Sequence, residues 1–133
     1  MKSMTPAQWR EFLLFGTRTA KVATVRSNGF PHVAPVWFVL DGDELVFTTF
    51  KMSIKGKNLL REPRVMISVD DEPAPFAFVL INGMAAVEEL SPKELLPWTT
   101  RIASRYVATG QADGYGKRNA VEGELLVSDR TGK

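Results

Sequence analysis

The dipeptide Asn28-Gly29 is the feature that most constrains how this chain can fold. It separates two segments rich in Val, Ala and Thr, residues 18–26 and residues 32–40. Asn-Gly is typical of a two-residue hairpin turn, because both central positions of a type I′ turn need a positive φ. We therefore predict an antiparallel hairpin. Pro35 cannot donate a ladder hydrogen bond, so its strand should lie at an edge or carry a bulge.

Short apolar segments bounded by turn residues continue this pattern along the chain. Strands are predicted over residues 44–50, 64–70, 76–88 and 122–128, which together with the hairpin gives six. Gly83, inside the longest segment, predicts a bulge or a close backbone approach. Six strands in antiparallel meanders, with few helices, indicate a mainly β fold. We expect a small antiparallel barrel with peripheral α-helices.

Helices are predicted at three places, and each begins at a Ser or Thr whose hydroxyl can cap the first free N–H groups. The first follows Thr5-Pro6 and ends at Gly16, the second covers residues 53–62, and the third covers residues 91–107. Residues 109–119 are polar and glycine-rich, which predicts a loop with a short helix.

Length and composition place the chain in one ordinary globular class. The sequence has 133 residues, 44% hydrophobic and 24% charged, which predicts a single domain over residues 1–133. It has no Cys, which excludes disulfides, thiolate nucleophiles and Cys-ligated metals. No apolar run approaches the ~20 residues of a membrane span, and the N-terminus lacks a signal peptide's apolar core. We expect a cytoplasmic protein without metal or membrane association.

The catalytic side chains of the sequence are few. His32 is the single histidine, which excludes a His-rich metal site within one chain. It follows the hairpin turn at the start of a strand, and no Ser-His-acid arrangement has support from spacing. A structural or ligand-contacting His32 is favoured over a catalytic base. The acidic residues cluster at 70–72 and 88–89, at predicted turns or strand ends, where solvation explains them. No catalytic residue is assigned.

The charges of the chain are unevenly distributed, although its net charge is only +2. Residues 51–64 hold five Lys or Arg against one acid, and residues 98–118 hold four against one. Between them, residues 65–97 hold one Lys against six acids. The two basic segments could converge on one anionic ligand. Two solvated helix faces fit the same pattern.

The segment from Thr48 to Arg64 carries the local chemistry of an anion site. A strand ends in two threonines, and a capped helix start with two lysines follows. Free N–H groups at a helix start, a hydroxyl and ammonium groups are what a phosphate prefers. A capped, basic surface helix explains the same residues. The candidate residues are Thr48, Thr49, Ser53, Lys55, Gly56, Lys57 and Asn58.

The second candidate feature is the aromatic-rich segment Pro35-Val36-Trp37-Phe38. Such a strand belongs to a hydrophobic core in most proteins. Alternatively it forms a flat wall for a planar ring, and backbone groups freed at a proline bulge bond the ring's edge atoms. The sequence leaves both interpretations open.

The chain resembles a known family over residues 1–128. The segments that carry the resemblance are MTPAQWREFL, GTRTAKVATVRSNGFPHVAPVWFVLDGD and TTFKMSIKGKNLLREPRVMISVDDEPAPFAFVLINGMA. They resemble the split-barrel flavin and deazaflavin proteins related to pyridoxamine 5′-phosphate oxidase, and among these the F420-dependent enzymes. The element Ser53-x-Lys55-Gly56 is similar to the family's phosphate-binding segment. Lys57 departs from the arginine of many members, so a bidentate grip would become a point-charge contact.

The resemblance implies a homodimer of six-stranded split barrels with two cofactor sites at the dimer interface. It implies that the strand of Pro35, Val36 and Trp37 lines the cofactor ring, and that the residues from Thr48 to Asn58 named above surround the phosphate and polar tail. Helix 91–107 of the partner chain would close the site. By position alone, its contributors would be Trp98, Arg101 and Arg105.

The function implied by this resemblance is hydride transfer from reduced F420 to an electron-poor small molecule. Such a function suits a chain without a nucleophile, because the cofactor supplies the difficult chemistry. FMN is the competing cofactor, and a binding protein without turnover is a further alternative. Nucleic-acid binding is disfavoured, because the acidic segment 65–97 interrupts any continuous basic track.

Overall fold

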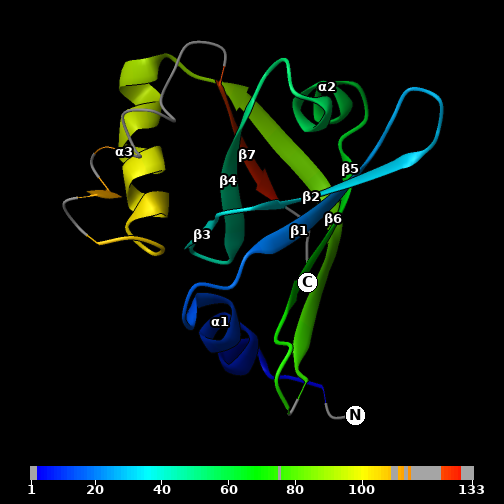
Figure 1. Ribbon diagram of the computed structural model, residues 1–133. Coiled ribbons are helices and arrows are strands. Elements are labelled where there is room, and N and C mark those ends of the chain that lie inside the picture. The colour runs from blue at the N-terminus through cyan, green and yellow to red at the C-terminus, as the bar shows by residue number, and fades with distance from the viewer. Residues whose placement is uncertain (1–2, 75, 109–110, 113, 115–123, 130–133) are drawn as a thin grey trace.

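The computed structural model describes residues 3–74, 76–108, 111–112, 114 and 124–129, and Figure 1 shows how their elements are arranged. The elements run in the order α1 (Pro6–Leu14), β1 (Ala20–Val25), β2 (Pro31–Val36), β3 (Val39–Asp41), β4 (Glu44–Phe50), α2 (Ile54–Arg61), β5 (Arg64–Asp70), β6 (Phe78–Glu89), α3 (Pro92–Ala103) and β7 (Glu124–Asp129). None of the helices in these ranges is long and apolar enough to cross a membrane.

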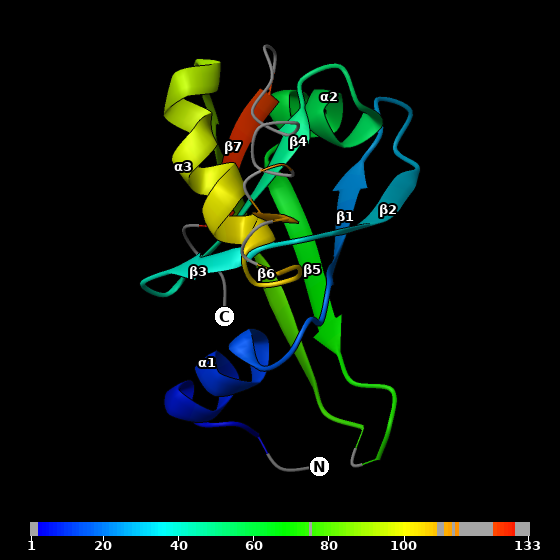
Figure 2. The same ribbon diagram turned by 60° about the vertical axis from the view of Figure 1, so that its left-hand side comes forward.

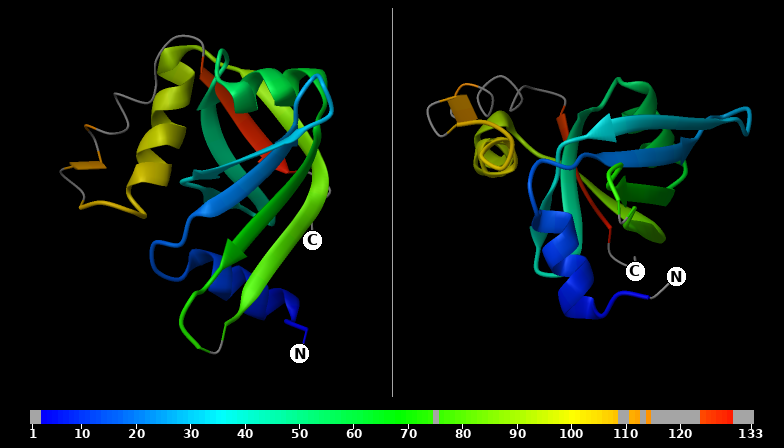
Figure 3. Two further views of the ribbon diagram at one scale, coloured as in Figure 1. Left: turned by 45° about the vertical axis from the view of Figure 1, so that its right-hand side comes forward. Right: turned by 60° about the horizontal axis from the view of Figure 1, so that its bottom comes forward.

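The strands form one antiparallel sheet in the order β2-β1-β5-β6-β7-β4-β3. The two outermost strands, β2 and β3, are consecutive in the chain and are separated only by Trp37 and Phe38. The sheet must therefore curl until its two edges approach each other, as the two views of Figure 3 show. β6 joins the halves of the sheet, because it pairs with β5 as far as Met84 and with β7 from Ala85 onward.

The mainly β, antiparallel barrel with peripheral helices is confirmed, with seven strands in place of six. The difference lies in the segment predicted as one strand over residues 32–40, which divides into β2 and β3. At the break, Phe38 makes hydrogen bonds with side chains of residues 105 and 106 rather than with a strand. Strands β4 and β5 have the predicted bounds.

The hairpin exists, but its turn is not the predicted type I′. Gly29 has a φ of 88°, whereas Asn28 is not in the left-handed region. The N–H of Gly29 donates to the carbonyl of Arg26 at 2.9 Å, and the N–H of Arg26 donates to the carbonyl of Phe30 at 2.8 Å. This is the three-residue loop in which a left-handed glycine follows a turn. The edge position predicted from Pro35 is confirmed, because β2 ends the sheet.

Gly83 does not interrupt the ladder of β6. It pairs with Val65 in an unbroken register with β5, so the predicted bulge is absent there. The strand changes its partner from β5 to β7 two residues later.

The helix starts follow the predicted caps. Thr5 and Ser91 each form a capping box, with Gln8 and Glu94 respectively, and Ser53 accepts the N–H of Gly56. The third helix ends at Ala103, short of the predicted residue 107. The loop predicted over residues 109–119 lies mostly outside the described residues.

Two hydrophobic clusters position the helices. The larger fills the barrel, with Phe38, Phe47, Ile67 and Leu125 among its fully buried members. The smaller lies between α3 and the outside of the sheet, and it consists of Val39, Val46, Leu95, Ile102 and Leu126 with Trp37, Leu90, Trp98 and Tyr106 packed against it. Figure 2 shows α3 alongside β7 and β4, with α1 and α2 at opposite ends of the barrel. This second cluster fixes α3 beside the end of β2.

Candidate functional site

A cavity of about 250 Å³ lies where the break between β2 and β3 meets β4 and the helices α2 and α3. It collects residues from four separate parts of the chain. They are Pro35, Val36 and Trp37, then Thr48, Thr49 and Phe50, then Lys55, and finally Thr99 and Ile102. Six of these nine were candidates from the sequence. The structure therefore brings the aromatic segment and part of the anion-site segment to one place.

Trp37 is the aromatic residue at the strand break that lines this cavity, and it follows β2 directly. Trp37 is half-buried, because it packs against the smaller hydrophobic cluster and stacks on the ring of Tyr106, with centroids 4.9 Å apart and planes inclined by only 6°. Stacked aromatic rings gain attraction beyond their buried area. A stacked indole that still lines a cavity can present its exposed surface to a planar ligand.

Threonines and one lysine add polar residues to the lining of the cavity. Thr48 and Thr49 lie near the end of β4, and Lys55 lies in the first turn of α2. The hydroxyl oxygens of Thr49 and Ser53 are 3.1 Å apart, which ties the end of the strand to the helix start. An apolar wall beside hydroxyls and a cation suits a ligand with a flat ring and an anionic group.

Ser53 and Gly56 hold the backbone around the cavity and do not line it. The Ser53 hydroxyl donates to the carbonyl of Phe50 at 2.7 Å and accepts the N–H of Gly56 at 2.9 Å. A Cβ atom on Gly56 would lie 2.2 Å from the Phe50 carbonyl oxygen, closer than real contacts allow. Gly56 therefore allows the start of α2 to lie against the end of β4.

Lys57 and Asn58 also lie away from the cavity lining. Lys57 is exposed, and residues two apart on a helix do not share a face, so it diverges from Lys55. Asn58 is 4% exposed and donates to the Thr24 hydroxyl at 3.0 Å. Its side-chain oxygen accepts from Arg61 at 3.1 Å, and its bond to Thr24 joins α2 to β1.

Trp98, Arg101 and Arg105 make contacts within their own chain instead of lining its cavity. Arg101 donates to the Leu40 carbonyl at 2.8 Å and lies over the Trp98 ring. Arg105 donates to the backbone carbonyls of Phe38 and Leu13. The same helix supplies Thr99 and Ile102 to the cavity of its own chain. Sequence reasoning missed both, although their spacing of three places them on one helix face.

His32 lies opposite Thr24 in the β1–β2 ladder and is not among the residues that line the cavity. Its Nδ1 atom is buried without a hydrogen-bond partner. Burial lowers the pKa of His32 below its ordinary value of 6.5, and the positive charges of Arg26 and Lys55 lower it further. His32 therefore lies on β2 beside α2, and its imidazole is neutral at neutral pH.

This shift predicts how stability depends on pH. Between the lowered pKa and 6.5, the unfolded chain binds a proton that the folded chain does not, so the free energy of unfolding should rise with pH in that window. Urea unfolding between about pH 5 and pH 7 measures this slope. His32→Gln should remove the part of the slope just below pH 6.5. An unchanged slope in that variant would contradict the assignment.

Comparison with known proteins places this chain in a family. A family model described as pyridoxamine 5′-phosphate oxidase matches residues 5–126. The chain belongs to the pyridoxamine 5′-phosphate oxidase family. A search of curated proteins found no match.

Solved structures show how widely this fold is shared. An F420 reductase is 26% identical, with a TM-score of 0.68 and 90% coverage of both chains. A conserved hypothetical protein from Mycobacterium tuberculosis is 24% identical, with a TM-score of 0.81 over 97% of this chain and 81% of that chain. The haem storage protein HutZ from Vibrio cholerae is 16% identical, with a TM-score of 0.72 over 97% of this chain and 91% of that chain. The last two similarities show the fold alone.

Proposed function

We propose that this protein is an F420-dependent oxidoreductase that transfers a hydride from the reduced cofactor to an electron-poor small molecule. The observation that carries the proposal is the cavity that Trp37 lines together with Thr48, Thr49 and Lys55. The similarity to a solved F420 reductase, over nine-tenths of both chains, favours the deazaflavin among the family's cofactors.

The chain's own residues would bind and orient the reactants. Trp37 and Val36 would lie along the cofactor ring, while Lys55 would face an anionic group of the tail. A bound deazaflavin supplies two-electron hydride chemistry, which suits a chain that has no Cys and one His. Holding ring and acceptor in contact is then the protein's main contribution to the rate.

The size of the cavity favours a site that two chains complete. Small-molecule sites are typically about 300–1,000 Å³, whereas this cavity is about 250 Å³. The outward face of β1, β2, β5 and β6 also carries exposed apolar side chains, with 64% of Val33, 42% of Met66 and 52% of Leu80 exposed. Val33, Ala23 and Met66 lie in one row across three neighbouring strands. We propose that this face forms a homodimer interface.

The dimer proposal predicts a change of mass in solution. Met66→Lys should convert the dimer to monomer, or weaken the dimer at least about tenfold, because a lysine at the centre of an apolar interface is left unpaired. Light scattering after size-exclusion chromatography measures this. Leu14→Lys, at an exposed position on α1, is the control and should leave the mass unchanged. A wild type that is monomeric at micromolar concentration would refute the proposed interface.

FMN is the second candidate, and the side chains of α3 give a specific reason to keep it. A long anionic tail would profit from the second basic segment, but Arg101 and Arg105 bond backbone carbonyls of their own chain. FMN has a single phosphate on a short tail, so it needs fewer cationic partners. A binding protein without turnover would use the same cavity.

Parallel titrations with F420 and FMN, followed by fluorescence quenching, test the proposal. Tighter binding of F420, together with oxidation of its reduced form by quinones, nitroaromatics or unsaturated ketones, is the expected result. Tighter binding of FMN would transfer the function to a flavin-dependent enzyme. Binding without turnover across the whole acceptor panel would indicate a carrier, and binding of neither cofactor would refute the proposed site.

A further inference from the structure

The break between β2 and β3 is held by two side chains that follow α3. Phe38, at the break, has both of its backbone polar groups bonded to them. Its N–H donates to the hydroxyl of Tyr106 at 3.2 Å, and its carbonyl accepts from the guanidinium of Arg105 at 2.6 Å. These bonds replace the ladder bonds that a continuous strand would have provided.

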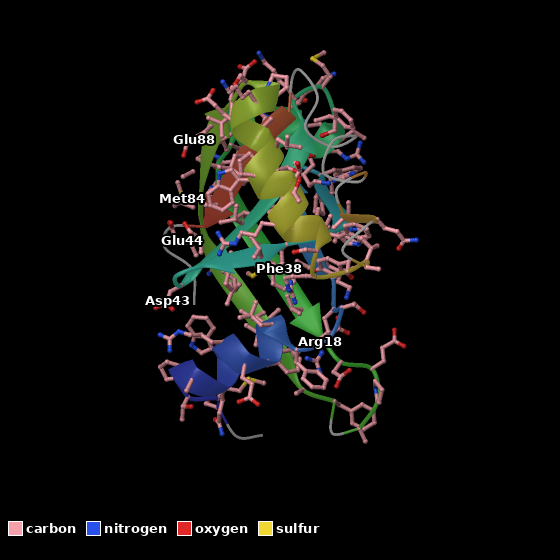
Figure 4. The ribbon with its side chains drawn as sticks, turned by 90° about the vertical axis from the view of Figure 1, so that its left-hand side faces the viewer. Arg18, Phe38, Asp43, Glu44, Met84 and Glu88 are labelled. Carbon is pink, nitrogen blue, oxygen red and sulfur yellow. The ribbon has the colours of Figure 1, made fainter. Side chains whose placement is uncertain are left out.

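The same two side chains reach the N-terminal part of the chain. The Tyr106 hydroxyl donates to the carbonyl of Arg18 at 2.9 Å, and Arg105 donates to the carbonyl of Leu13 at 3.0 Å. Figure 4 shows Phe38 between the end of α3 and α1, with Arg18 close to the end of α1. Arg105 also lies over the rings of Phe38 and Tyr106, at 4.6 and 5.0 Å from their centroids. Arg105 and Tyr106 therefore join the break at Phe38 to the N-terminal part of the chain.

Tyr106 is also the surface on which Trp37 rests. The two rings are nearly parallel, the indole also packs against the smaller hydrophobic cluster, and Trp37 lines the cavity. An indole that could rotate about its side-chain bonds would lose part of its binding energy in ordering itself on a ligand. A preorganised wall avoids that cost.

We propose that Tyr106 and Arg105 are positioning residues that fix the orientation of Trp37 and thereby set the affinity for a planar cofactor ring. This inference rests on the proposed function for its ligand, but its geometric part concerns Trp37 alone. Neither side chain lines the cavity, so both act through the backbone of Phe38 and the indole.

The protonation state of Tyr106 agrees with this role. Burial raises the pKa of Tyr106 above its ordinary value of 10.0, although the bonds from Phe38 and Arg105 partly oppose the shift. The phenol therefore stays protonated at neutral pH and keeps the O–H that donates to the Arg18 carbonyl. A hydroxyl that both donates and accepts is what this junction requires.

Two substitutions distinguish the contribution of the Tyr106 hydroxyl to cofactor binding from that of its ring. Tyr106→Phe keeps the stack and loses the hydrogen bonds, and we expect about fivefold weaker binding of FMN or F420. Tyr106→Leu loses both, and we expect about thirtyfold weaker binding. Ser91→Ala is the matched control, because it removes the cap of the same helix and destabilises the fold without touching Trp37. Its affinity for the cofactor should stay within about twofold of the wild type.

A second measurement follows Trp37 without any ligand. In a background in which Trp9 and Trp98 are replaced by Phe, near-ultraviolet circular dichroism reports only one indole. Tyr106→Leu should strongly reduce its signal, Tyr106→Phe should reduce it partly, and Ser91→Ala should preserve it. An unchanged signal in both Tyr106 variants would overturn the positioning role.

The two measurements together distinguish this inference from the proposed function. If the wild type binds neither cofactor, the proposed function fails, while the Trp37 signal still decides whether Tyr106 orients the indole. If the cofactor binds and the Tyr106→Leu variant retains wild-type affinity despite a lost Trp37 signal, the link from orientation to affinity is overturned. Loss of both signal and affinity, with the Ser91→Ala control intact, is the expected result.

Discussion

Replacing Lys55 with Ala should weaken the binding of F420 or FMN by about 10- to 100-fold, the largest effect that we expect of a change in the candidate site. Lys55 is the one lysine among the residues that line the cavity. A hydrogen bond to a charged group contributes about 1.5–3 kcal/mol, and each 1.4 kcal/mol corresponds to a tenfold change in affinity. Fluorescence titration at low and high salt measures the loss and its electrostatic share.

Lys57→Ala is the matched control for this experiment. It removes the same charge from the same helix, but at an exposed position that does not line the cavity. Its effect should remain within about threefold, as a long-range screened charge allows. Equal losses in the two variants would instead mean that a general positive potential attracts the cofactor. In that case the assignment of Lys55 to the tail would be wrong.

Gly56→Ala should lower the free energy of unfolding by about 1–3 kcal/mol, the cost of forcing an extra methyl group into a packed site. The sign is the informative part, because Ala within a helix is ordinarily more stabilising than Gly. Here the new Cβ would meet the Phe50 carbonyl at 2.2 Å and the Lys51 carbonyl at 3.0 Å. Both obstacles are backbone atoms that cannot rotate away.

Urea unfolding of Gly56→Ala beside Lys57→Ala measures this cost. Lys57→Ala should be neutral or slightly stabilising, because it improves helix propensity at an exposed site. The Gly56 variant should also bind cofactor more weakly. Thr48 and Thr49, which line the cavity, lie at the end of β4 that the new methyl group would displace. A stabilised Gly56 variant would mean that the start of α2 can move away from β4 without strain.

The local features of the fold could be predicted because their causes are local in the sequence. A Ser or Thr before each helix, and apolar segments between turn residues, fix where helices and strands begin and end. The bounds of β4 and β5 and all three helix caps follow from such signals. The hairpin position was predictable for the same reason. Its turn type was not, because Asn28-Gly29 also suits a longer loop with a left-handed glycine.

The break after β2 could not be predicted, because its cause lies far along the chain. Phe38 leaves the ladder to bond Tyr106, which is 68 residues away. The sequence of residues 32–40 contains no sign of this partner. A continuous strand was therefore the simplest interpretation, and it was wrong.

The residue types of the candidate site could be predicted from the sequence, but the directions in which their side chains point could not. Charge patterns identify Lys55, Lys57, Arg101 and Arg105 equally, and only packing decides where each one points. Lys55 lines the cavity, whereas Arg105 bonds the carbonyls of Phe38 and Leu13. Arginine, with several donors on one planar group, is well suited to joining backbone segments in this way. A basic residue near a predicted anion site can therefore serve the fold alone.

The position of β2 at the end of the sheet has a consequence for how the folded protein behaves at high concentration. An exposed edge strand of a sheet can pair with strands of other molecules and so promote aggregation. Because the Arg26 N–H bonds the Phe30 carbonyl, the alternation of an antiparallel ladder directs the backbone nitrogens of Pro31, Val33 and Pro35 away from β1. Two of these three nitrogens belong to proline and carry no hydrogen. An incoming strand would thus find a single N–H donor along β2. The two prolines therefore hinder the addition of further strands at this edge of the sheet.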